Sequence, residues 1–197
     1  DLLTQVGLPF ETKISHMDEE KSYGDPEQTA CLLAEKKARD VLYHRVGKSW
    51  VLGADTVVVV DSATSEIPAR QNGTIIRILG KPKDAKEAIH MLRLLSGKEH
   101  RVITGFCILD PSGKTAHLEA VITRVHIKKL SDQEIDAYVN THEPFGKAGS
   151  YAIQGIGAFM VKSISGSYTN VVGLPLYALT KALVAVRALK GFPLPQD

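Results

Sequence analysis

The fold of this chain is decided by residues 50–60, whose sequence is WVLGADTVVVV. Only Gly53, Asp55 and Thr56 interrupt the apolar character of this run. A continuous apolar stretch rich in valine is typical of a strand that is covered on both faces. We therefore expect a buried strand over residues 50–60, with one acidic side chain inside it.

Asp55 is the sharpest functional signal in this strand. An unpaired charge is costly to bury, so a carboxylate at this position needs a partner or a task. Gly53 and Ala54 carry little or no side chain and would let a ligand approach the backbone. A carboxylate that faces a cleft can bind a divalent metal or activate water. The structural alternative is an exposed aspartate on an edge strand.

Helix and strand signals alternate on both sides of this strand. The expected helices cover residues 26–46, 82–95, 132–140 and 175–189, the further strands cover 74–79, 101–109, 115–128 and 157–164, and a short extended segment covers 11–15. This alternation predicts an α/β fold in which a mixed sheet is flanked by helices. We expect residues 1–197 to form a single domain with two lobes and a cleft.

Composition and charge exclude several classes of protein. The chain has 197 residues, of which 44% are apolar, as is usual for a globular protein. A net charge of +2 is nearly balanced, which argues against a large nucleic-acid interface. No apolar run approaches the roughly 18 residues that span a bilayer, and no secretion signal opens the chain. Cys31 and Cys107 lie in apolar surroundings without a metal-binding pattern, which is typical of free thiols in a reducing cytoplasm.

Two lysines are candidates for contacts with phosphate. Lys37 falls on the apolar stripe of the helix expected over residues 26–46, where a lysine either extends its charged end to solvent or points into a site. Lys81 lies between an expected strand and the next helix. Backbone N–H groups and the helix dipole favour an anion there. Position alone decides neither role.

An acidic cluster, Asp18, Glu19 and Glu20, follows the first extended segment. Such clusters are usually solvated loop charges. If one of these acids meets Asp55, the two carboxylates would form an oxygen-ligand site for Mg²⁺ or Mn²⁺. The sequence leaves open whether they meet.

Residues 143–157, EPFGKAGSYAIQGIG, are rich in glycine and in selected polar side chains. Glycines allow a ligand to approach the backbone, Lys147 can neutralise phosphate, and Gln154 offers both a donor and an acceptor to a base edge. The segment matches neither a P-loop nor a dinucleotide-binding fingerprint. The structural alternative is a mobile surface loop. Farther on, Asn170 is interpreted as a turn residue before the last helix.

Six short motifs follow one another along the chain. They are Gly53-Ala54-Asp55-Thr56, Gly80-Lys81-Pro82, Leu95-Ser96-Gly97 with His100 and Val102-Ile103-Thr104-Gly105, Glu143-Pro144 with Lys147-Ala148-Gly149, Tyr151 with Ile153-Gln154-Gly155, and Asn170-Val171-Val172-Gly173-Leu174-Pro175. In these motifs and in their order, the chain resembles the Maf family of nucleotide pyrophosphatases over nearly its whole length.

The resemblance implies a two-lobed α/β fold with a central cleft, related to the inosine triphosphate pyrophosphatases, and usually a homodimer. It implies hydrolysis of a nucleoside triphosphate to the monophosphate and pyrophosphate with a divalent cation, Mg²⁺ or Mn²⁺. Asp55 matches the family's catalytic acid. Lys37, Lys81 and one acid of the pair Asp18 and Glu19 match its other polar site positions.

Within the family, the sequence around Lys147 and Gln154 resembles the branch that acts on dTTP and UTP, rather than the branch that prefers 7-methyl-GTP. Thr56 and Gln154 match positions regarded as setting that preference. A glutamine can pair with the O4 and N3–H edge of uracil or thymine, so the chemistry is consistent.

Two departures from the family pattern bear on activity. The family opens with a strand and a Ser-x-Ser-Pro-Arg-Arg loop just before the position of Asp1, and we expect that this segment has been removed from the chain. The family usually has an aspartate where this chain has Gly146. Both departures keep an alternative open, namely a nucleotide-binding regulator of cell division or septum formation with impaired catalysis.

The sequence thus predicts a cytoplasmic, metal-dependent dTTP/UTP pyrophosphatase that removes non-standard pyrimidine nucleotides as well, with no nucleic-acid or membrane partner. Its expected site consists of Asp55 as catalytic residue, of Lys37, Thr56, Lys81, Lys147 and Gln154 as substrate contacts, and of Asp18, Glu19 and Asp55 as metal ligands.

Overall fold

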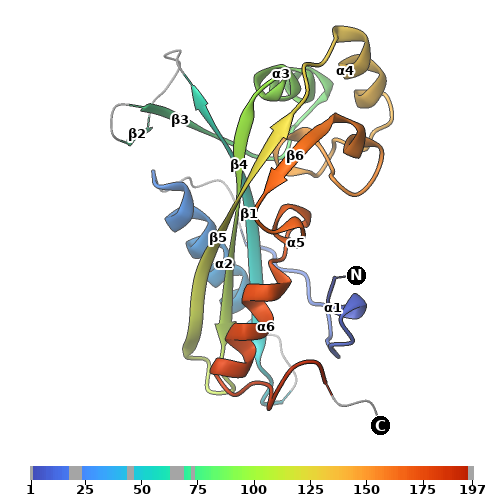
Figure 1. Ribbon diagram of the computed structural model, residues 1–197. Helices are drawn as coiled ribbons and strands as arrows, with labels where there is room; N and C mark the ends of the chain where they lie inside the picture. The colour runs from blue at the N-terminus through green and yellow to red at the C-terminus, as the bar shows by residue number, and fades with distance from the viewer. Residues whose placement is uncertain (1, 18–23, 44–46, 63–68, 72–73, 195–197) are drawn as a thin grey trace.

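The computed structural model describes residues 2–17, 24–43, 47–62, 69–71 and 74–194. Its centre is a six-stranded sheet in the order β2-β3-β1-β4-β5-β6. The strands are β1 (Val51–Ser62), β2 (Ala69–Gln71), β3 (Thr74–Leu79), β4 (Glu99–Leu109), β5 (Thr115–Ile127) and β6 (Val161–Ser165). The long strands β1, β4 and β5 run through the length of the molecule (Figure 1).

Helices cover this sheet at both ends. They are α1 (Leu2–Gln5), α2 (Pro26–Leu42), α3 (Ala85–Leu95), α4 (Asp132–Val139), α5 (Tyr168–Val172) and α6 (Leu176–Ala185), with 3-10 helices η1 (Ala148–Ser150) and η2 (Ile156–Met160). Helices α3 and α4 lie at one end and α6 at the other, which gives two lobes (Figure 1). Among the described residues, none of these helices has the length and apolar character needed to cross a bilayer.

The predicted α/β fold, with a sheet flanked by helices, is confirmed, but the prediction of a mixed sheet is wrong. Every recorded pairing of neighbouring strands is antiparallel. Strands β3 and β4 both pair with β1, so they run parallel to each other without being neighbours, and α3 connects them. The alternation of strands and helices therefore reflects a crossover around a central strand.

Helix α2 packs closely against β1 and β4. The inner side of the helix consists of Ala30, Ala34 and Ala38, which are at most 1% exposed. A Cβ on Gly53 would lie 2.2 Å from the Ala34 carbonyl oxygen, and a Cβ on Gly105 would lie 2.3 Å from the Ala30 carbonyl carbon. Only glycine fits at these two strand positions, because any side chain would force the helix backbone away from the sheet.

The start of α2 is defined by local chemistry. The Asp25 carboxylate accepts a hydrogen bond from the Gln28 N–H at 2.9 Å, and Pro26 occupies the first helical turn. Both are favourable at a helix N-terminus. The helix predicted over residues 26–46 ends at Leu42, and residues 44–46 lie outside the described residues.

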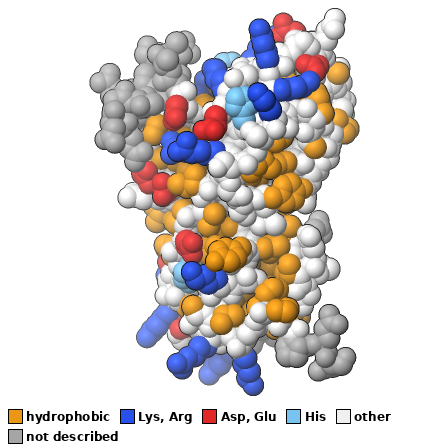
Figure 2. Space-filling view, viewed as in Figure 1, with side chains coloured by type: hydrophobic (Ala, Val, Ile, Leu, Met, Phe, Trp, Pro, Cys, Tyr) orange, Lys and Arg blue, Asp and Glu red, His pale blue; other side chains and the backbone are white. Residues whose placement is uncertain are grey.

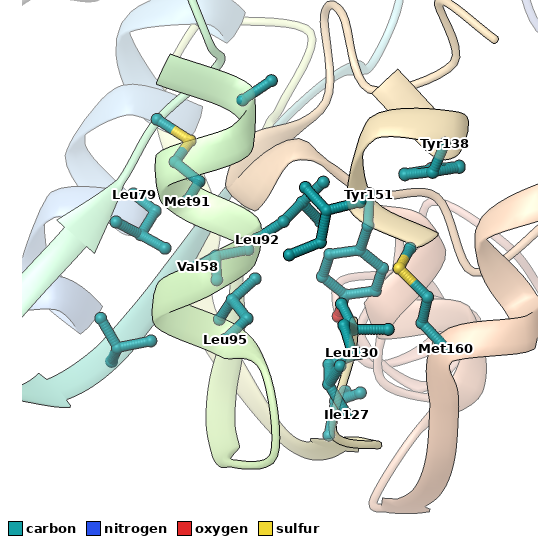
Figure 3. Close-up of a cluster of buried hydrophobic side chains, with 14 of the residues drawn as sticks. Val58, Leu79, Met91, Leu92, Leu95, Ile127, Leu130, Tyr138, Tyr151 and Met160 are labelled. Carbon is teal, nitrogen blue, oxygen red and sulfur yellow. The ribbon is translucent and has the colours of Figure 1, made fainter. Parts of the chain in front are cut away.

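The opposite face of the sheet carries two apolar clusters, one in each lobe. In the larger cluster Leu92 of α3 points toward Tyr151 (Figure 3), and Val58 of β1 belongs to the same cluster. In the smaller cluster Phe106 of β4 packs with Leu179 of α6. The two lobes are therefore joined by the strands that contribute to both clusters.

Two predicted segments differ from the structure. The strand predicted over residues 157–164 begins only at Val161, because the chain before it forms η2. The N–H groups of Ile156 and Gly157 bind the Glu143 carboxylate instead of a strand. Residues 11–15 have no regular structure, and the nearby His16 N–H donates to Asp40 of α2 at 2.9 Å.

Replacing Gly105→Ala tests the close contact of α2 with the sheet. We expect a loss of about 1–3 kcal/mol, or more, in the free energy of unfolding, because the new methyl group meets helix backbone rather than a flexible side chain. Denaturant titration measures this loss. The matched control is Gly191→Ala, where a Cβ would meet nothing within 4 Å. Equal stability of the two variants would contradict the described packing.

Candidate active site

Asp55 lies on β1 where one edge of the sheet opens. Strand β3 pairs with β1 only from Val58 onward, whereas β4 pairs along the other edge and places Gly105 opposite Asp55. Asp55 and Gly53 are two residues apart and so share the strand face that meets α2. The Asp55 side chain is 10% exposed. Asp55 is therefore the mostly buried acid that the sequence predicts, and it lies beside the edge of β1 that β3 leaves uncovered.

Lys37 of α2 is the partner of Asp55. Its Nζ donates to Asp55 Oδ1 at 2.5 Å, and the lysine side chain is 20% exposed. Lys37 thus points inward rather than into open solvent. The pair offsets part of the cost of holding a carboxylate in a strand.

A pocket of about 410 Å³ adjoins this pair, a size typical of small-molecule sites. It is lined by every predicted site residue that the structure describes, namely Lys37, Asp55, Thr56, Lys81, Lys147 and Gln154. The predicted metal ligands Asp18 and Glu19 lie outside the described residues. Residues far apart in the sequence are therefore brought together around one cavity.

The lining of the pocket combines charged and neutral side chains. Lys37, Lys81 and Lys147 contribute positive charge, and Asp55 is the only carboxylate among the described residues of the lining. The neutral side chains of the lining include Val58, Val102, Tyr151, Ile153 and Val171. This combination suits a ligand with an anionic chain and a ring.

Glu143 organises the glycine-rich loop that forms one wall of the pocket. Its carboxylate accepts hydrogen bonds from Tyr138 Oη at 2.8 Å, from the Ile156 N–H at 2.9 Å and from the Gly157 N–H at 2.8 Å. A Cβ on Gly155, whose φ is +153°, would lie 2.1 Å from Glu143 Oε1. The loop is thus closed around this carboxylate, which holds the neighbouring Gln154 at the pocket.

The same interactions change the acidity of Glu143. Burial alone would raise its pKa, but the hydrogen bonds from Gly157, Tyr138 and Ile156, together with the charge of Lys147, lower the pKa below its usual value. The group is therefore ionised at neutral pH, as three converging donors require.

A second tie connects this loop to the end of β3. The Gly149 N–H donates to the Gly80 carbonyl oxygen at 3.0 Å. Lys81 follows Gly80, and Lys147 lies just before Gly149. This hydrogen bond therefore explains why lysines from two distant segments line one pocket.

His100 anchors Tyr151 beneath the pocket. The Tyr151 Oη lies 2.8 Å from His100 Nε2, and the two rings meet edge to face with centroids 5.5 Å apart. Burial and, second, the nearby His126 lower the pKa of His100 to about 4. Burial also raises the pKa of Tyr151. The pair is neutral at neutral pH, so its role is to hold the tyrosine ring in place.

A polar network below Thr56 was missed by the sequence interpretation. Thr56 Oγ1 lies 2.9 Å from Thr104 Oγ1, and Thr104 donates to the Asn170 carbonyl oxygen at 3.0 Å. The fully buried Asn170 side chain donates to the Val102 carbonyl oxygen at 3.1 Å and to Thr123 Oγ1 at 3.0 Å. Asn170 is thus more than a turn residue, because it binds α5 to the sheet. The sequence did contain a signal for this network, namely the polar residues Thr104 and Thr123 inside the apolar strands β4 and β5.

The fold and the pocket together define an α/β protein in which three lysines line a pocket beside a partly buried carboxylate. The chain belongs to the Maf family, because the family model described as "Maf-like protein" matches residues 1–186.

Curated relatives agree with this assignment. The chain is 47% identical over 185 residues to a protein named dTTP/UTP pyrophosphatase from Ruminiclostridium cellulolyticum, an alignment that covers 93% of this chain and 88% of the relative. It is 44% identical to the protein of the same name from Syntrophotalea carbinolica, covering 97% and 81%. It is 42% identical to that from Geotalea uraniireducens, covering 96% and 91%.

Replacing Glu143→Gln tests the loop. We expect a loss of about 1–3 kcal/mol in the free energy of unfolding at neutral pH, because one amide oxygen cannot serve three donors. The control is Glu99→Gln, which removes a surface ion pair with Arg124 at 3.3 Å and should cost less than about 1 kcal/mol.

The effect of Glu143→Gln should also depend on pH. Because the pKa of Glu143 is lower in the folded protein than in the unfolded chain, the stabilisation is complete above the unfolded value near 4.5 and is lost as pH falls through the folded value. Denaturant titrations from neutral to acidic pH should therefore show the difference between unmodified protein and variant shrinking. A difference that stays constant would contradict the ionised carboxylate.

Proposed function

We propose that this protein is a nucleoside triphosphate pyrophosphatase that hydrolyses dTTP and UTP to the monophosphate and pyrophosphate. The observation that carries the proposal is the pair of Asp55 and Lys37 at a pocket that also contains Lys81, Lys147 and Gln154. The names of the relatives support this choice of substrates.

The lysines account for binding and for the leaving group. Lys37, Lys81 and Lys147 line the pocket and would contact the phosphate chain. Negative charge grows on pyrophosphate as the bond to the α-phosphorus breaks, and fixed cations stabilise that charge more in the transition state than in the substrate. The base would lie against apolar side chains of the lining, within reach of the Gln154 amide.

Asp55 is the group proposed to handle water. Its carboxylate orients a water molecule toward the α-phosphorus and accepts a proton as the new phosphorus–oxygen bond forms. The bond from the α-phosphorus to the bridging oxygen breaks, and pyrophosphate leaves with the electron pair. Lys37 holds Asp55 Oδ1, so the acceptor keeps one orientation.

A divalent cation, Mg²⁺ or Mn²⁺, is proposed as cofactor. One carboxylate together with substrate phosphates is a usual way to hold Mg²⁺, and Asp55 fits this arrangement. Across the part of the chain that the structure describes, no group of three or more His, Cys, Asp or Glu side chains could hold a metal by itself. Asp18 and Glu19 remain candidates for a further carboxylate. When bound, the cation would neutralise phosphate charge and polarise the α-phosphate.

We further propose a cytoplasmic homodimer without a nucleic-acid or membrane partner. Cys31 and Cys107 are free thiols, which fits a reducing compartment. The net charge of +2 argues against nucleic acid. Apolar side chains are exposed in patches on the face drawn in Figure 2, and exposed Ile156 and Tyr177 offer apolar surface to a second subunit.

The variant Asp55→Asn tests the central assignment. Losing the proton acceptor should lower kcat for pyrophosphate release from dTTP by about 100-fold or more. The matched control is Asp61→Asn on the same strand, because Asp61 is 65% exposed and pairs with Arg101 at 3.4 Å outside the pocket. Its kcat should stay within about twofold of the unmodified protein.

Both variants should be assayed in the full-length protein with dTTP, UTP and 7-methyl-GTP. Activity of Asp55→Asn within a few-fold of the control would show that Asp55 is not the catalytic residue. Tight binding of dTTP by the unmodified protein without release of pyrophosphate would favour a nucleotide-binding regulator instead.

A further inference from the structure

Gly149 and Ser150 turn the chain beside the pocket with two consecutive left-handed residues. Their φ angles are +70° and +62°. Glycine adopts this conformation freely, whereas serine adopts it only at a cost. Strained residues of this kind persist where the surrounding structure holds them, and they cluster at ligand-binding sites. The left-handed Ser150 therefore calls for contacts that hold it and for a role that explains it.

Met91 of α3 holds the Ser150 side chain. Ser150 Oγ donates to Met91 Sδ at 3.0 Å, and the two residues are 0% and 5% exposed. Thioether sulfur is a weak acceptor, but a fully buried hydroxyl group without any acceptor is costly. Among the described residues, no other side-chain hydrogen bond of Ser150 is recorded. The Ser150 N–H donates to the Lys147 carbonyl oxygen at 3.1 Å, which closes the turn.

The two arms of this bend reach the same pocket. Lys147 lines the pocket on the arm before the bend, and Gln154 lines it on the arm after the bend. Gly149 and Ser150 themselves are not among the lining residues. The backbone direction at the bend therefore decides whether the lysine and the glutamine face one cavity.

The bend packs directly on β1 and α3. A Cβ on Gly149 would lie 2.9 Å from Val58 Cγ1, and the Gly149 N–H binds the Gly80 carbonyl oxygen. Both contacts involve only the backbone of Gly149. The side-chain contact that fixes the bend is therefore the hydrogen bond from Ser150 to Met91.

Neighbouring contacts limit how much the loss of this hydrogen bond can change. Tyr151 is held by His100, and the Ala152 N–H donates to Tyr138 Oη at 3.1 Å. Without the hydrogen bond to α3, the bend should loosen but not unfold. A lost hydrogen bond of this kind corresponds to a few-fold to about tenfold loss of ligand affinity.

We propose that Ser150 is a positioning residue for the substrate: its hydrogen bond to Met91 holds the left-handed bend, and the bend keeps Lys147 and Gln154 at one pocket. This inference rests on the proposed function as a nucleoside triphosphate pyrophosphatase. Ser150 acts through the two residues that line the pocket and touches no reacting atom.

The test uses Ser150→Ala and Met91→Leu in the full-length protein, each of which removes the hydrogen bond. The dissociation constants of dTMP and of pyrophosphate, measured by calorimetry, should rise about three- to tenfold, as should KM for dTTP, with kcat within about twofold. The matched control is Met160→Leu, the same substitution at a fully buried position of the same apolar cluster. Its dissociation constants should stay within about twofold of those of the unmodified protein.

Two further readouts separate positioning from general packing. The double variant Ser150→Ala/Met91→Leu should bind no more weakly than either single variant, because both substitutions delete the same hydrogen bond. In the ligand-free protein, amide hydrogen exchange over residues 147–154 should be faster in both single variants than in Met160→Leu.

Unchanged binding and exchange in Ser150→Ala would overturn the inference, as would additive losses in the double variant or a fall in kcat at constant KM. If Ser150→Ala does not fold, Ser150→Gly replaces it, because glycine adopts the positive φ without strain and also lacks the hydroxyl group. The same weakening is then expected. Failure of the proposed function is distinguishable, because the unmodified protein would release no pyrophosphate from dTTP, while the exchange measurement would still test Ser150.

Discussion

The close contact between α2 and the sheet positions both the core of the molecule and the Asp55 side chain. Hydrogen atoms in place of side chains at Gly53 and Gly105 let the alanine side of α2 approach the backbone of β1 and β4. This approach brings Lys37 within hydrogen-bonding distance of Asp55. Without it, a carboxylate in an apolar strand would lose a cation that offsets its burial. The packing of small residues between α2 and the sheet therefore also positions the ion pair of the site.

The other wall of the pocket is positioned by a different device. The Glu143 carboxylate gathers Tyr138, Ile156 and Gly157, while a backbone hydrogen bond ties Gly149 to Gly80. Both devices consist of hydrogen bonds within the protein. Such preorganised cations and amides cost little reorganisation when negative charge develops on a phosphate, which is the usual source of catalytic power in this kind of site. Residues 143–157 are thus held in place by hydrogen bonds to the rest of the protein and form one side of the pocket.

The sequence predicted the fold class and the residues that line the pocket, but it predicted the bounds of individual strands less well. Asp55 stood out because an acid in a valine-rich strand is costly, and Lys37 because it breaks an apolar stripe. The strand expected at residue 157 begins at Val161, since Glu143 captures backbone amides from a segment that is distant in sequence. The role of Asn170 also depends on tertiary contacts that no local pattern contains. The metal ligands Asp18 and Glu19 stay a prediction, as they lie outside the described residues.

Hydrolysis of dTTP in ¹⁸O-enriched water reveals which phosphorus is attacked, and the proposed mechanism has water at Asp55 facing the α-phosphorus. The heavy oxygen should appear in the monophosphate, and the pyrophosphate should remain unlabelled, because the bond between the α-phosphorus and the bridging oxygen is the one that breaks. Mass spectrometry of the two products reads the position of the label. Label in pyrophosphate, or release of orthophosphate in place of pyrophosphate, would contradict the proposed reaction.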